Sequence, residues 1–146
     1  MNDAWLEPLD LETCLMHLRG QVVGRLAVVV DEYPIVLPVN YRLVDAGGRN
    51  WIALRTRPGN VIDQASNAAF EIDGIDEIHR RGWSVLVRGT LLHVDPDAAG
   101  FRDRFDADPW LTAERDAWIV IEPFAITGRE LHDAAYEWAF HSQAYL

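Results

Sequence analysis

Two arginines flank a threonine just before a Pro-Gly turn, in the stretch from Trp51 to Asn60, WIALRTRPGN. The stretch opens as an apolar run typical of a strand and then acquires Arg55, Thr56 and Arg57. A short helix is expected to follow, from about Asn60 to Asn67. Guanidinium groups and a hydroxyl beside a helix N-terminus are well suited to bind an anion such as a phosphate. The alternative is an ordinary strand–turn–helix segment with two solvated arginines, since short motifs also occur by chance.

Other patterns that carry catalysis are incomplete. The five histidines show neither H-x-x-x-H nor carboxylate-paired spacing, so no metal site is expected. The segment Gly82-Trp83-Ser84-Val85-Leu86 begins like a nucleophile elbow, but Leu86 stands where the second glycine is required. The single cysteine, Cys14, lies in a predicted amphipathic helix and is interpreted as a buried structural thiol.

The chain contains no lysine, because all 13 basic residues counted as Lys or Arg are arginine. This excludes Schiff-base catalysis on the protein and a phosphate-binding loop of the Walker type. Difficult chemistry would therefore have to come from a bound organic cofactor. A phosphorylated aromatic cofactor needs an anion-binding corner, an apolar slot and polar groups along the ring edge.

Length and charge narrow the class of protein. The 146 residues predict one domain, residues 1–146, in which 129–146 form a tail that packs on the body or on a second subunit. The net charge of −10 argues against nucleic acid and against anionic membrane surfaces as partners. No apolar run approaches the roughly 18 residues of a membrane span, and the N-terminus lacks signal-peptide features, so a cytoplasmic location is expected.

Apolar periodicity predicts a mainly β protein with small peripheral helices. One helix is expected from Leu11 to about Arg19 with Asp10 as its N-cap, and another from about Ala98 to Phe105. The expected strands are Gly24–Asp31, Ile35–Val44, Trp51–Arg57, Ala68–Asp73, Ser84–Val94 and Ala117–Ile126. The tail from Gly128 is a candidate helix. Hairpin-scale loops without βαβ repeats favour a closed or partly open antiparallel barrel, because closure removes exposed strand edges.

Two positions inside the expected strands indicate irregular backbone. Pro38 cannot donate to a β-ladder, which implies a bulge or a free edge where backbone groups of Val39, Asn40 and Tyr41 become available. Asn40 and Tyr41 then either line a ligand site, or turn outward and close the core respectively. Gly89 predicts a bulge or bend in the longest strand.

Several short motifs recur together in a familiar order and spacing. They are Gly24-Arg25-Leu26-Ala27, Pro38-Val39-Asn40-Tyr41, Arg55-Thr56-x-Pro58-Gly59, Phe70-Glu71-Ile72-Asp73, Gly82-Trp83-Ser84-Val85-Leu86-Val87-Arg88-Gly89 and Ile126-Thr127-Gly128-Arg129. From about Leu9 to Arg129 the chain resembles the pyridoxamine 5′-phosphate oxidase-like, FMN-binding split-barrel family, in its short bacterial branch near the nitroimidazole-resistance-like proteins.

The resemblance implies a six-stranded antiparallel split β-barrel that forms a homodimer, with FMN at the subunit interface. Arg55 and Thr56, with Asn60 at the start of the next helix, would hold the FMN phosphate. The flavin ring would lie beside a second set of residues, formed by Val39, Asn40 and Tyr41. Trp83 and Ser84 would close the site.

The expected activity is that of a flavin-dependent oxidoreductase that accepts hydride from a reduced nicotinamide and reduces a small organic substrate. No residue is assigned as an acid or base catalyst. Two alternatives remain: a deazaflavin coenzyme or haem in place of FMN, or a cofactor-free or cofactor-sensing dimer that keeps the barrel as an interaction module.

One position departs from the resemblance. The family commonly places a phosphate-binding lysine shortly after the glycine of this turn, where this chain has Asn60 and Val61. A charge-assisted contact worth about 1.5–3 kcal/mol would be missing, which corresponds to roughly one or two decades in affinity. Arg57 and Arg88 are the candidates to replace it.

Overall fold

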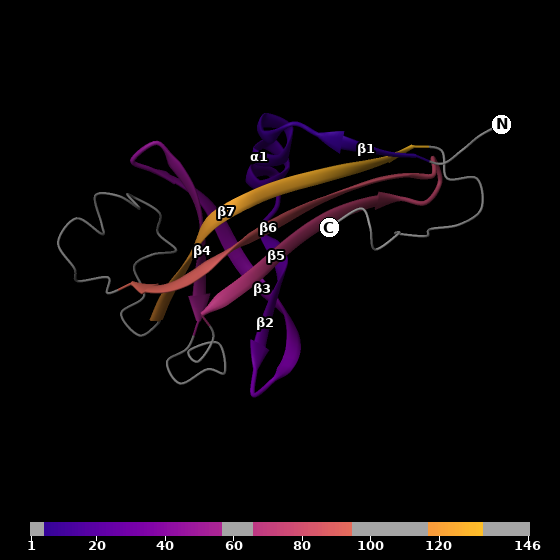
Figure 1. Cartoon of the computed structure of the whole chain (residues 1–146). Coiled ribbons are helices and arrows are strands. Elements are labelled where there is room, and N and C mark those ends of the chain that lie inside the picture. The colour runs from indigo at the N-terminus through magenta and orange to yellow at the C-terminus, as the bar shows by residue number, and fades with distance from the viewer. Residues whose placement is uncertain (1–4, 57–65, 95–116, 133–146) are drawn as a thin grey trace.

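The computed structural model describes residues 5–56, 66–94 and 117–132 (Figure 1). It contains one helix and seven strands in these ranges. In chain order they are β1 (Trp5–Leu9), α1 (Leu11–Gly20), β2 (Val23–Val30), β3 (Tyr33–Ala46), β4 (Arg49–Thr56), β5 (Asn67–Asp76), β6 (Arg81–Val94) and β7 (Ala117–His132). Within the described residues, no helix is long and apolar enough to cross a membrane.

The strands form one antiparallel sheet that closes on itself. The order is β1-β7-β4-β3-β2-β5-β6, and β6 also pairs with β7. Strands β2 to β7 therefore make a six-stranded barrel, while β1 is added at the outside of β7 (Figure 1). The predicted fold class, a mainly β antiparallel split barrel, is confirmed.

The core fills the barrel and continues under α1. Alternate residues of β2 are buried, and they meet fully buried side chains such as Phe70, Ile72 and Val85 from β5 and β6. Helix α1 closes the core with Cys14 and Leu18. The predicted structural role of Cys14 agrees with this burial, which raises the pKa of its thiol.

The predicted helix start is also confirmed. The Asp10 carboxylate accepts a hydrogen bond from the Thr13 backbone N–H at 2.8 Å, as expected of an N-cap.

The expected irregularity at Gly89 is a β-bulge. Gly89 pairs with Pro123 and Arg88 pairs with Ala125, so Phe124 is the extra residue on β7. A Cβ on Gly89 would lie 2.2 Å from the Glu122 carbonyl oxygen, and only glycine fits this close approach. The exposed Phe124 ring lies under the Arg88 guanidinium, whose carbon is 5.6 Å from the ring centroid.

The structure differs from the sequence-based prediction at both ends of the described chain. The tail from Gly128 was expected to be helical, but β7 continues to His132 and pairs there with both β1 and β6. Residues 129–132 are therefore part of the sheet rather than of a tail. Strand β1 was not predicted, because its five residues, WLEPL, are too short to show a period. Residues 133–146, most of the predicted helix at 60–67 and the one at 98–105 lie outside the described residues.

Candidate functional site

The sheet opens between β3 and β4, at the place where the sequence analysis located the anion-binding corner. The β3–β4 ladder runs from Ala46↔Arg49 to Tyr41↔Leu54, and within the described residues it includes nothing before Tyr41. Beyond Leu54, β4 continues along β7, where Arg55 pairs with Trp118 and Thr56 with Ala117. We call this opening the β3–β4 corner: Val39, Asn40 and Tyr41 on β3 with Arg55 and Thr56 on β4.

Backbone direction shows which groups face the opening. The Tyr41 N–H donates to the Val22 carbonyl at 3.0 Å, so it points toward β2. Because direction alternates along a strand, the backbone groups of Pro38 and Asn40 point the other way, toward the opening. Pro38 therefore costs no ladder hydrogen bond, and the predicted free edge is confirmed. The Asn40 N–H and the Pro38 C=O face the gap beside the end of β4, while the Asn40 C=O faces the Arg55 N–H at the last pair of the ladder.

The cationic half of the corner is described only in part. Arg55 and Thr56 belong to β4, but their side chains lie outside the described part of the chain. Asn60, Arg57 and Val61 lie in the stretch 57–65, which is also outside it. The roles of these residues in phosphate binding therefore stay predictions.

The Tyr41 side chain belongs to the core. Its hydroxyl donates to the Leu18 carbonyl of α1 at 2.6 Å, and its ring meets Phe70 edge-on, with centroids 4.6 Å apart. Burial raises the pKa of Tyr41 to about 12. Of the two sequence interpretations, the one with Tyr41 closing the core and Asn40 turned outward fits these side chains. The backbone of both residues is still part of the corner.

Trp83 and Ser84 lie elsewhere on the barrel. Both are on β6, which β5 and β2 separate from β3. The Trp83 indole stacks on the His17 ring of α1 with centroids 3.8 Å apart and packs over Gly74, where a Cβ would come within 2.6 Å of it. Ser84 is buried, 3% exposed, between its neighbours Asp73 and Arg129. One subunit thus does not place these two residues next to the corner, and their part in cofactor binding stays a prediction.

Two of the recurring motifs meet on adjacent strands, β2 and β5. Gly24 leaves room for the Phe70 ring, since a Cβ there would lie 2.2 Å from its Cζ atom. The Arg25 guanidinium donates to Glu71 at 2.7 Å and also to Asp73. Burial raises the pKa of Glu71, and the Arg25 contact partly opposes this. These motif residues are thus used in packing and cross-strand pairing.

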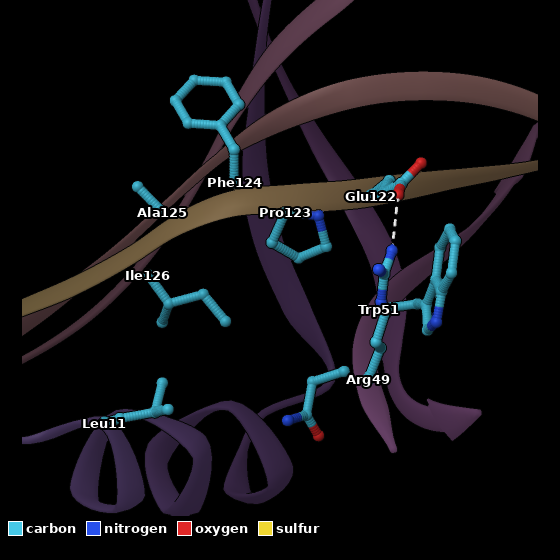
Figure 2. A pocket seen from close by; sticks show the side chains of 9 residues that line it. Leu11, Arg49, Trp51, Glu122, Pro123, Phe124, Ala125 and Ile126 are labelled. Atoms are coloured by element: carbon cyan, nitrogen blue, oxygen red, sulfur yellow. Dashed lines mark hydrogen bonds and ion pairs between the residues drawn. The ribbon is translucent and has the colours of Figure 1, made fainter. Parts of the chain in front are cut away.

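A shallow pocket of about 650 Å³, not predicted from the sequence, lies between α1, the start of β4 and the middle of β7 (Figure 2). Its walls include Leu11, Trp51 and Phe124. Arg49 and Glu122 also line it and form an ion pair at 3.0 Å. Arg49 and Arg55 begin and nearly end β4, six residues or roughly 20 Å apart. This pocket is therefore separate from the corner in one subunit. No sequence motif marked it, because its lining residues come from three distant segments.

Comparison with known proteins gives consistent results across sequence and structure. Residues 10–130 match the family model described as pyridoxamine 5′-phosphate oxidase. A relative from Mycobacterium tuberculosis, the uncharacterized protein Rv0080, is 29% identical over 125 residues, covering 82% of each chain.

Two of the solved structures that resemble this chain illustrate the similarity, which covers most of their length. The FAD binding protein from Mycobacterium smegmatis is 26% identical with a TM-score of 0.64, covering 86% of this chain and 98% of that one. A FAD-binding protein from Mesorhizobium loti has a TM-score of 0.72 at 22% identity, covering 88% and 98%, and supports the fold alone.

Proposed function

Because the chain belongs to the pyridoxamine 5′-phosphate oxidase family, we propose that it binds a flavin at the β3–β4 corner and acts as a flavin-dependent oxidoreductase. The observation that carries the proposal is the open β3 edge at Asn40, which lies directly beside the end of β4 that contains Arg55 and Thr56. A flat ring with a phosphate arm fits a site with an unpaired strand edge on one side and a cation and hydroxyl on the other.

Each part of the corner has a separate task in this proposal. Arg55 and Thr56 hold the phosphate, and Asn60 adds an N–H from the start of the next segment. The Asn40 N–H binds the edge of the ring, and Val39 supplies apolar contact. When bound, the flavin supplies the hydride and electron transfer from a reduced nicotinamide to a small organic acceptor. The protein binds and orients it.

FMN is the proposed flavin, and FAD is the closest competitor. The M. smegmatis structure, at 26% identity, is named for FAD. Both flavins carry a phosphate next to the ribityl chain, so the corner serves either one, and affinity decides between them. A deazaflavin coenzyme and haem are further ligands to include in the same comparison.

We also propose that the chain works as a homodimer. The outer face of the β2–β3 hairpin carries an exposed row of apolar side chains, among them Val23, Val29 and Val36, and Asn40 lies at its end. Exposed apolar surface of this kind marks an interaction site. Val36→Asp should therefore convert a dimer to a monomer in light scattering after size exclusion, while Ile78→Asp, in the exposed β5–β6 turn, should not.

The experiment is a thermal-shift panel on the purified chain with FMN, FAD, a deazaflavin coenzyme and haem. A ligand that binds the folded state raises the melting temperature. The expected result is the largest rise with FMN, strongly reduced in Arg55→Ala and kept in Arg19→Ala, an exposed arginine of α1. If no flavin raises the melting temperature and the purified protein is colourless, the proposal is wrong.

A second function is favoured by Val61, which stands where the family commonly has a phosphate-binding lysine. It is a cofactor-free or cofactor-sensing dimer in which the barrel serves as an interaction module. This hypothesis predicts a colourless protein that forms a stable dimer without a ligand and whose melting temperature does not rise with FMN.

A further inference from the structure

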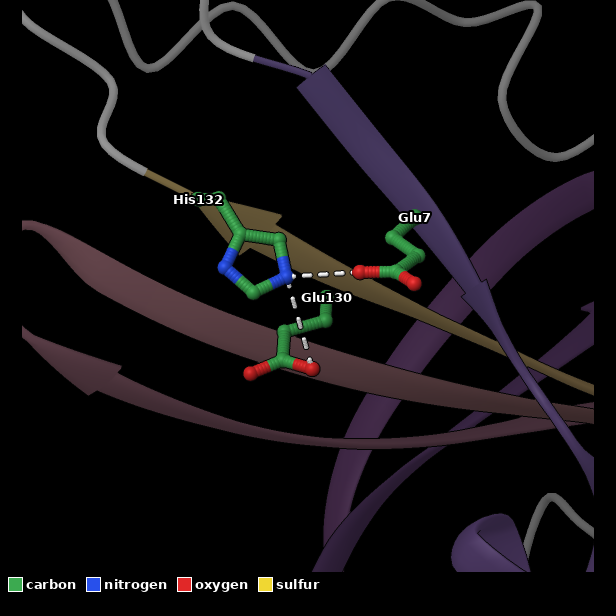
Figure 3. Close-up of side chains that lie close together, drawn as sticks. All are labelled: Glu7, Glu130 and His132. Carbon is green, nitrogen blue, oxygen red and sulfur yellow. Dashed lines mark hydrogen bonds and ion pairs between the residues drawn. The ribbon is translucent and has the colours of Figure 1, made fainter.

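Three metal-ligating side chains converge outside the proposed flavin site, where β1 lies along the end of β7 (Figure 3). The His132 Nε2 lies 2.9 Å from Glu7 Oε2 and 3.6 Å from Glu130 Oε2. One ligand atom from each residue falls within 4.8 Å of the others. Glu7 comes from β1 and the other two from β7, so the cluster joins the first and last strands among the described residues.

The strand register places two negative charges face to face. Glu7 pairs directly with Glu130, and His132 lies two residues further along β7 on the same face. Like charges directly opposite each other destabilise an antiparallel pair. The side chains of Glu7 and Glu130 nevertheless turn toward the same imidazole nitrogen instead of spreading into solvent (Figure 3). A positive charge between the two carboxylates would relieve this repulsion.

We propose that Glu7, Glu130 and His132 form a binding site for a divalent transition-metal ion of the zinc class. Ligand atoms bound tetrahedrally at zinc distances lie roughly 3.3 Å apart. The two separations from Nε2, 2.9 and 3.6 Å, bracket this value before any ion is placed. An imidazole with two carboxylates favours zinc over magnesium or calcium, which prefer oxygen ligands alone.

Three protein ligands leave a coordination position for water. The ion would also balance the two carboxylate charges and fasten β1 onto the barrel. Within one subunit the site is separate from the β3–β4 corner, because its residues belong to β1 and to the far end of β7.

No metal site was expected from the sequence, and two physical reasons explain why this cluster was not predicted. Glu130 and His132 form an E-x-H pair, which places both side chains on one face of a strand but not of a helix. The segment was expected to be helical, so the pair carried no signal. The third ligand, Glu7, is 125 residues from His132 and belongs to a strand that was not predicted.

The test is calorimetric titration of Zn²⁺ into the full chain after treatment with EDTA and dialysis, with Mg²⁺ as a parallel titrant. The expected result is saturable binding of one zinc ion per chain, no comparable binding of magnesium, and a higher melting temperature with zinc. His132→Gln and Glu130→Gln should each weaken zinc binding by at least about tenfold. Circular dichroism checks that both variants are folded.

His79→Gln is the matched control. His79 Nδ1 lies 2.7 Å from Asp76 Oδ2, which makes an exposed imidazole–carboxylate pair without the second carboxylate. This variant should bind zinc like the wild type. The proposal is overturned if the wild-type chain shows no saturable binding, if His132→Gln and Glu130→Gln both retain it, or if His79→Gln loses it equally.

Discussion

The β3–β4 corner and the end of the barrel under α1 both carry polar groups, but they use them differently. Under α1, the Tyr41 hydroxyl is bonded to Leu18 and the Trp83 indole is stacked on His17. At the corner, the Asn40 N–H faces an opening between two strands. The polar and aromatic groups under α1 stabilise the fold, whereas the corner keeps a backbone group available for a ligand.

The largest effect is expected where a motif residue serves packing. Gly24→Ala would place a Cβ 2.2 Å from the Phe70 ring and 3.0 Å from the Glu71 carbonyl oxygen, so ring and backbone must shift. Overpacking of this kind costs about 1–3 kcal/mol or more. Chemical denaturation should show this loss in the free energy of unfolding.

Gly20→Ala is the control for that change, because nothing lies within 4 Å of the added Cβ at the exposed end of α1. Its stability should equal or slightly exceed that of the wild type. Equal stabilities for the two variants would show that the Gly24 motif is not there for packing.

Tyr41→Phe should destabilise the protein by about 1–3 kcal/mol, because it leaves the buried Leu18 carbonyl without its donor. Flavin affinity should stay within about twofold, since the hydroxyl faces α1 and not the corner. Urea denaturation and a flavin titration measure the two quantities. A large loss of flavin affinity with unchanged stability would move Tyr41 into the binding site.

Tyr41 also predicts a dependence on pH. Its pKa rises to about 12 in the folded state from an ordinary value of 10.0. A raised folded-state pKa contributes stability that is fully present below pH 10 and is lost as the pH rises through about 12. The stability difference between wild type and Tyr41→Phe should therefore shrink over this interval. A constant difference would contradict the buried hydroxyl.

The smallest effect is expected at Arg25, whose side chain is 45% exposed. Arg25→Gln should cost only about 0.2–1 kcal/mol near neutral pH. Because the Arg25 contact lowers the pKa of Glu71, this pKa should rise further in the variant. The stability deficit should then decrease as acid protonates Glu71. NMR titration of the Glu71 carboxyl checks the direction, and an unchanged or lower pKa would contradict the ion pair.

The barrel was predictable because its signals are local. Asp10 capped the expected helix, apolar runs located strands β2 to β7, and Gly89 marked the bulge. Pro38 even predicted the free edge, since a residue without an N–H must sit where no ladder bond is formed.

The site was less predictable, because short motifs report packing as well as binding. No local pattern shows that the Trp83 indole packs on Gly74 and His17 within one subunit, because this depends on contacts between β6 and α1. The Glu7–His132 contact similarly depends on the pairing of the two ends of the chain, which no local pattern contains.

The most direct test of this division is a flavin fluorescence titration of Arg55→Ala and Trp83→Phe beside the wild type. Arg55→Ala removes a charge-assisted phosphate contact, so the Kd for FMN should rise by roughly ten- to a hundredfold. Trp83→Phe keeps an aromatic ring against His17 but removes part of the packed indole, so stability should fall. The Kd for FMN should stay within about twofold. If Arg55→Ala binds FMN like the wild type while Trp83→Phe loses it, the flavin does not bind at the β3–β4 corner.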